Sequence, residues 1–136
     1  MTIGAVTRRA LVVSPTPAAE AAEERLRNLY DFVDMADADI VVALGGDGFM
    51  LETLHRFLGR GMPVYGMHRG SVGFLMNDYA EDDLPARIAS AQAATIHPLR
   101  MRAISNGCTP VEALAINEVS LLRESRQAAK IRILVD

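Results

Sequence analysis

Apolar and polar positions along the chain predict strands and helices in alternation. The short β-branched stretch at 9–13 predicts a buried strand, which ends at the turn residues Ser14-Pro15-Thr16-Pro17. From Ala18 onward, apolar residues recur every three or four positions, as on one face of a helix. Thr16 suits the N-cap of this helix and Pro17 its first turn. The apolar face comprises Ala18, Ala22, Leu26, Leu29 and Val33.

The unbroken apolar run at 40–44 predicts a second strand, and its lack of alternation is typical of a parallel strand covered on both faces. A second amphipathic helix is predicted over 49–60 and a third strand over 63–65. Strand, helix, strand, helix and strand in this order predict a right-handed parallel α/β sheet. A further helix is expected over 82–91.

The pattern changes after residue 93 and becomes rich in strand-like stretches. These stretches are 94–104, 111–122 and 128–135. Asn106-Gly107 is a hairpin-turn signal between the first two. We therefore expect an α/β domain over 1–96 and the start of a β-rich domain over 97–136. Because the last strand-like stretch ends one residue before the chain does, we expect this second domain to be truncated.

Glycine is concentrated where ligands of parallel sheets bind. Eight of the ten glycines lie between residues 45 and 73, and the densest clusters follow the second and third predicted strands. Ligands of such sheets sit beyond the carboxyl ends of the strands. The first cluster is Gly45-Gly46-Asp47-Gly48, whose glycines permit positive φ angles and close approach of a ligand to the backbone. The helix start that follows favours phosphate oxygens.

Asp47 is the unexpected residue of this cluster, because a carboxylate repels phosphate. Its presence implies a proton to accept or a cation to hold, such as phosphate-bound Mg²⁺. The structural alternative is a tight turn in which Asp47 caps the following helix.

The second cluster spans residues 66–75. Arg69 has the chemistry to clamp a phosphate, and Phe74, after Gly73, could lie along a nucleotide base. The alternative places Phe74 in the core and Arg69 in solvent. The dinucleotide fingerprint Gly-x-Gly-x-x-Gly is not met, which disfavours a hydride-transfer site.

A third feature is the polar pair Asn117-Glu118 inside the apolar run 113–122. Neighbouring residues of a strand point to opposite faces, so at least one of the two is expected to meet something other than solvent. A ribose, with its vicinal hydroxyls, supplies matching donors and acceptors. A turn or bulge is the alternative explanation.

Composition narrows the function classes. The 136 residues carry a net charge of −3 without a basic stripe, so we expect no nucleic-acid partner. The longest apolar run, 40–44, is far shorter than the roughly 20 residues of a bilayer span, so we expect no membrane partner. The single cysteine, Cys108, favours the reducing cytoplasm.

Taken together, the three motifs resemble the NAD kinase family of ATP:NAD 2′-phosphotransferases. They are the run 40–48 with its Gly-Gly-Asp-Gly turn, the glycine segment 66–75 and the Asn117-Glu118 pair. The resemblance implies a phosphofructokinase-like, Rossmann-like first domain and a second domain that binds NAD. It also implies NAD as substrate, ATP or polyphosphate as phosphate donor, and Mg²⁺ or another divalent cation carried by the nucleotide.

The resemblance assigns roles to individual residues. Asp47 corresponds to the general base that takes the proton from the 2′-hydroxyl of the adenosine ribose, and the main-chain N–H groups around Gly46 and Gly48 would share the phosphate charge. Asn117 and Glu118 match the motif that holds NAD. Phe74 lies where the family lines the adenine pocket, and Arg69 matches a family arginine.

The sequence also departs from the family pattern. Phe49 stands where many members have Thr or Asn, His68 where they have Asn, and Glu52 where some have a basic residue. The family's later Gly-Ser/Thr-rich motif does not occur within these residues. We therefore expect an amino-terminal portion with little turnover alone, and a homo-oligomer when full length. The alternatives are a related lipid or sugar kinase and a noncatalytic nucleotide-binding module.

Overall fold

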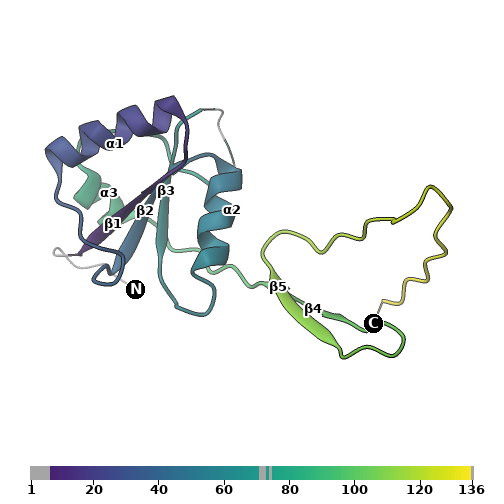
Figure 1. The fold of residues 1–136 in the computed structure, drawn as a ribbon. Helices are drawn as coiled ribbons and strands as arrows, with labels where there is room; N and C mark the ends of the chain where they lie inside the picture. Colours follow the sequence, from purple (N-terminus) through teal and green to yellow (C-terminus); the bar gives the residue numbers. More distant parts are fainter. Residues whose placement is uncertain (1–6, 71–72, 74, 136) are drawn as a thin grey trace. The chain divides into compact units, whose positions relative to one another are not determined.

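The computed structural model describes residues 7–70, 73 and 75–135. The chain forms two compact units, Met1–His97 and Pro98–Asp136, each described by itself below. The elements of the first unit are β1 (Arg9–Val13), α1 (Pro17–Leu29), β2 (Ile40–Gly45), α2 (Asp47–Arg56), β3 (Val64–His68) and α3 (Leu84–Ser90) (Figure 1). The second unit contains β4 (Leu99–Ala103) and β5 (Val111–Ala115).

The first unit is built on a three-stranded parallel sheet with the order β1-β2-β3. Every residue of the central strand β2 is buried, as the unbroken apolar run predicted. The predicted parallel α/β fold of this part is confirmed.

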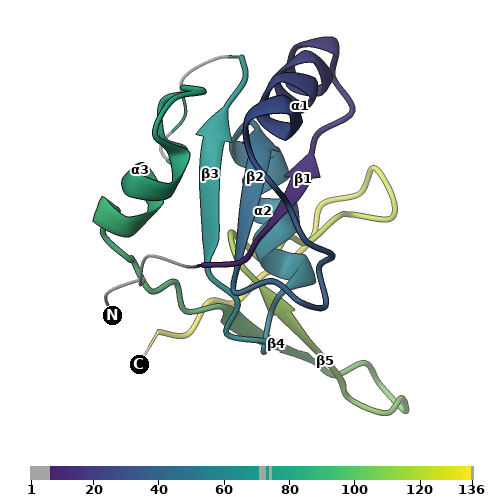
Figure 2. The same ribbon diagram turned by 90° about the vertical axis from the view of Figure 1, so that its left-hand side faces the viewer.

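Helices cover both faces of this sheet (Figures 1 and 2). On one face, α1 and α3 pack against alternate β2 residues, Ile40, Val42 and Leu44, and against Tyr65 and Met67 of β3. The residues between them, Val41 and Ala43, point to the opposite face, which α2 covers. The sheet therefore has a buried core on each side, and its carboxyl edge is left for the connecting segments.

The boundaries of the helices differ from the predictions. In α1 the buried face is Ala19, Ala22 and Leu26 rather than the series that starts at Ala18, and Leu29 is 54% exposed. The helix ends there, and the amide of Val33 donates to the carbonyl of Arg9 at 2.9 Å, so the chain already runs beside β1. Thr16 is the N-cap, as predicted, and its side chain accepts from the amide of Ala19.

The second and third helices are also shifted or shortened. The second begins at Asp47, two residues before the predicted start, and ends at Arg56, after which Gly59 and Gly61 adopt positive φ angles. The third spans seven residues, with Leu84 and Ile88 buried, while Ala91 lies beyond it and is exposed. None of the helices in the described part of the chain has the length and apolar character needed to cross a membrane.

The second unit contains an antiparallel hairpin of β4 and β5, in which Leu99 pairs with Ala115 and Ala103 with Val111. Gly107 has a φ of 76° in the connecting segment, where the turn was predicted. The predicted strand at 128–135 is wrong, because the described residues 116–135 contain no strand. Alternation produces a strand only where a neighbouring backbone is available to pair with it.

Candidate functional site

The two glycine clusters meet at the carboxyl ends of β2 and β3. Gly45 and His68, the last residues of these strands, are partners in the parallel register. The next residue, Arg69, donates its main-chain N–H to the carbonyl of Gly45 at 2.7 Å. The sheet thus joins two segments that lie more than twenty residues apart in the sequence.

The turn between β2 and α2 explains part of the first cluster. Gly46 is the N-cap and supplies no side chain, while Asp47 is the first helical residue. The structural alternative, in which Asp47 caps the helix, is therefore wrong. None of Gly45, Gly46 and Gly48 has a positive φ, so the conformational reason given for them is also wrong.

Close packing at Gly45 and open space beside Gly46 and Gly48 account for these glycines instead. A methyl group on Gly45 would come within 2.8 Å of the ring of Phe49, so this ring packs against the backbone of the glycine. Gly46 and Gly48 have no atom within 4 Å of where a Cβ would stand. The first turn of α2 therefore presents its backbone to open space at these two positions, as a phosphate site requires.

Asp47 links the first cluster to the second. Its Oδ1 accepts the main-chain N–H of Leu75 at 3.2 Å. A methyl group on Gly73 would overlap the Asp47 carboxylate, so the backbone of this glycine packs directly against it. The carboxylate is half-buried and is fixed between the start of α2 and the segment that follows β3.

Arg69 is held on the α1 side of the sheet. Its Nε donates to the carbonyl of Ala18 at 3.2 Å, and its guanidinium lies 4.3 Å from the centre of the Tyr79 ring. The Tyr79 hydroxyl donates to Oε1 of Glu81 at 3.2 Å, and burial raises the pKa of this tyrosine. Glu81 also pairs with Arg25 of α1 at 3.0 Å, and this hydrogen bond lowers the pKa of the carboxyl.

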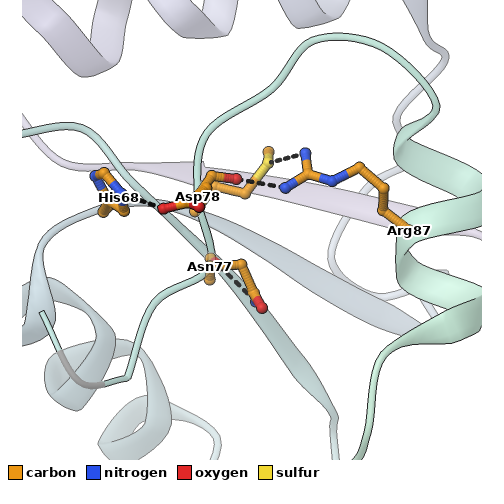
Figure 3. Close-up of polar contacts among 6 residues, drawn as sticks. His68, Asn77, Asp78 and Arg87 are labelled. Atoms are coloured by element: carbon orange, nitrogen blue, oxygen red, sulfur yellow. Dashed lines mark hydrogen bonds and ion pairs between the residues drawn. The ribbon is translucent and has the colours of Figure 1, made fainter. Parts of the chain in front are cut away.

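A second polar group, which the sequence analysis missed, follows the glycine segment (Figure 3). His68 Nε2 lies 3.0 Å from Oδ1 of Asp78. Asn77 lies beside β3, where its amide and its side-chain Nδ2 both donate to the carbonyl of Gly66, at 2.8 and 3.0 Å. Arg87 of α3 donates to the carbonyls of Asp78 and Ala80. The signals in the sequence were the polar pair Asn77-Asp78 after an apolar run and one arginine in a short apolar helix.

Three further predicted site residues are Asn117, Glu118 and Phe74. Asn117 and Glu118 belong to the second unit and lie beyond the end of β5 at Ala115, so their prediction as strand residues is wrong. Phe74 lies outside the described residues. Across residues 7–70, 73 and 75–135, no three His, Cys, Asp or Glu side chains come close enough together to hold a metal ion.

Comparisons with known proteins identify the family to which this chain is similar. The family described as the ATP-NAD kinase N-terminal domain matches residues 5–92. The chain is 56% identical over 131 residues to the NAD kinase of Caulobacter vibrioides, an alignment that covers 96% of this chain and 50% of that protein. It is 55% identical over 125 residues to the NAD kinase of Brucella melitensis, with 92% and 49% covered. For the NAD kinase of Rhizobium meliloti, the identity is 53% over 127 residues, with 93% and 49% covered. The chain spans about half the length of the curated relatives it matches.

Proposed function

The chain belongs to the NAD kinase family, and we propose that the protein transfers the terminal phosphate of ATP to the 2′-hydroxyl of the adenosine ribose of NAD, which gives NADP. The observation that carries this proposal is the position of Asp47. It is a carboxylate at the amino end of a helix, beyond the carboxyl end of the central strand, and the glycine segment after β3 packs against it. A site that binds only phosphate would not be expected to contain the Asp47 carboxylate, because the two negative charges repel each other.

In the proposed mechanism, Asp47 accepts the proton of the 2′-hydroxyl as that oxygen attacks the terminal phosphorus of ATP. The new O–P bond forms, the bond to the bridging oxygen breaks, and ADP leaves with the electron pair. The amide of Leu75 holds one carboxylate oxygen at 3.2 Å and so fixes the orientation of the base. Phosphoryl transfer depends mainly on positioning and on neutralisation of charge.

The backbone at Gly46 and Gly48 is suited to the phosphate charge. These residues form the N-cap and the first turn of α2, where main-chain N–H groups and the helix dipole favour anions. The divalent cation, Mg²⁺ by preference, enters with ATP as part of the substrate and neutralises phosphate charge. Polyphosphate is the alternative donor, since only the terminal phosphoryl group is transferred.

Further parts of the proposal concern residues beyond this turn. Arg69 is assigned to nucleotide binding, Phe74 to the adenine pocket, and Asn117 with Glu118 to the NAD ribose. Residues 97–136 are assigned to a β-rich, NAD-binding domain. We place the protein in the cytoplasm, in keeping with its single cysteine, and without nucleic-acid partners, in keeping with its net charge of −3. We further propose that it is a homo-oligomer without membrane partners.

The test is NADP formation from NAD, ATP and Mg²⁺ by the product of the complete reading frame, with residues 1–136 alone assayed beside it. The Asp47→Asn variant keeps an oxygen that can accept from Leu75 but removes the base. We expect its transfer rate to fall by roughly 10²- to 10⁴-fold, with NAD affinity changed only a few-fold. Asp82→Asn is the matched control, because Asp82 is exposed and precedes α3 rather than α2; it should leave the rate unchanged.

The alternatives give different results. A kinase of a lipid or sugar hydroxyl would release ADP only with that acceptor and form no NADP. A noncatalytic nucleotide-binding module would bind nucleotide equally well as the wild type and as the Asp47→Asn variant, and would show no transfer with any acceptor. Either result would refute the proposed reaction.

A further inference from the structure

Polar contacts join the end of β3 to Asn77, where the chain again lies beside this strand. Asn77 forms a parallel bridge with Met67 of β3. The amide of His68 donates to the carbonyl of Asn77 at 3.0 Å, and the amide of Asn77 donates to the carbonyl of Gly66 at 2.8 Å. Between these points in the sequence, the backbone at Gly73 and Leu75 contacts the carboxylate of Asp47.

Side chains on both faces of the sheet also join the end of β3 to the residues that follow Asn77. His68 bonds to Asp78, and the next residue, Arg69, stacks on Tyr79. Because neighbouring residues of a strand point to opposite faces, the two pairs lie on opposite sides of the β3 edge. Arg69 faces α1, whose Ala18 carbonyl it contacts, so His68 faces the side of α2 and of Asp47.

The His68–Asp78 pair has the properties of a positioning contact rather than of a stabilising one. The His68 side chain is 17% exposed and that of Asp78 is 93% exposed. A pair with one partner in solvent contributes at most about 1 kcal/mol to stability. A carboxylate only accepts hydrogen bonds, so Nε2 of His68 is the donor to Asp78, and the buried Nδ1 has no hydrogen-bond partner among the described residues. The imidazole is thus largely buried, and within the described part of the chain Asp78 is the side chain that it contacts through Nε2.

We propose that His68 and Asp78 are positioning residues for the phosphoryl transfer, because they set where the segment after β3 places its backbone against Asp47. This inference rests on the proposed function of Asp47 as general base. Arg87 donates to the main-chain carbonyl of Asp78 (Figure 3) and to that of Ala80, and these contacts tie residues 78–80 to α3.

Two amide substitutions of His68 differ in how far their side-chain nitrogen reaches. In His68→Gln, the side-chain nitrogen extends about as far as Nε2 and can still donate to Asp78, whereas the amide of His68→Asn is too short. We expect His68→Asn and Asp78→Ala each to lower kcat roughly tenfold, with little change in KM for ATP, because misplacement of a reacting group by about 1 Å can cost up to 10²-fold. His68→Gln should retain most of the kcat. The double variant should be no worse than either single variant, since both remove one contact.

Hydrogen exchange of the Leu75 amide, whose acceptor is Asp47, gives a readout independent of activity. Exchange should accelerate in His68→Asn and in Asp78→Ala, but not in His68→Gln or in the exposed controls His55→Asn and Asp82→Ala. Unchanged exchange at Leu75, or faster exchange with an unchanged kcat, would overturn the inference. Faster exchange in a protein whose wild type forms no NADP would support the contact but refute the proposed function, so the two failures are distinguishable.

Discussion

At the scale of single residues, the contact between Gly73 and Asp47 leads to a sharp prediction. A side chain at Gly73 would overlap the Asp47 carboxylate, and crowding of this kind typically costs about 1–3 kcal/mol. We expect Gly73→Ala to lower the free energy of unfolding by this amount in urea denaturation. Gly48→Ala is the comparison, because its methyl group meets open space in a helical turn and is expected to stabilise by up to about 1 kcal/mol. Equal losses in both variants would contradict the assigned contact.

The ion pair between Arg25 and Glu81 predicts a pH dependence of stability. Arg25 lowers the pKa of Glu81 in the folded state, so the stabilisation is fully present above the unfolded pKa, about 4.3, and is lost as the pH falls through the folded value. We expect Arg25→Gln to reduce the fall in melting temperature between pH 6 and pH 3. The control Arg56→Gln removes a charge from α2, away from Glu81, and should leave this fall as in the wild type. The idea fails if Arg25→Gln and wild type lose stability in parallel.

At the scale of elements, the N-cap of α1 is the contact most open to a direct test. The Thr16 side chain accepts from the amide of Ala19, and loss of such a cap costs about 1 kcal/mol. Thr16→Ala should therefore lower the midpoint of urea unfolding without a change in its slope. Thr95→Ala, an exposed threonine outside the helices, should leave the midpoint unchanged. A shift of equal size in both variants would mean that the cap is not the cause.

The elements also show where sequence reasoning works and where it stops. The strand at Ile40–Gly45 was predictable because an unbroken apolar run leaves one option in an α/β chain. The buried face of α1 was not predictable, because alanines at 18, 19, 21 and 22 make several faces of the helix equally apolar. The position of Asp47 follows from a local motif. The pairs His68–Asp78 and Arg69–Tyr79 depend on where the chain returns, which no local pattern encodes.

At the scale of the whole molecule, the hairpin of the second unit has one apolar face. The register brings together Leu99 with Ala115, Met101 with Ala113, and Ala103 with Val111, while Arg102 pairs with Glu112 on the other face. Leu99 is 51% exposed and Val111 is 60% exposed. Exposed apolar patches favour association, so this face is expected to bind apolar dyes and to promote self-association of residues 1–136.

The prediction is tested with a double substitution that keeps the strands. Leu99→Gln with Val111→Thr removes apolar surface, and threonine retains the β-branched shape that strands favour. We expect this variant of residues 1–136 to bind several-fold less anilinonaphthalene sulfonate and to sediment as a smaller species than the wild type. Arg100→Gln alters the polar face of the same hairpin and should change neither measurement. The register places Leu99 and Val111 on one side of the hairpin and Arg100 on the other. If the double variant and Arg100→Gln behave alike, the association therefore arises from a surface other than the apolar face.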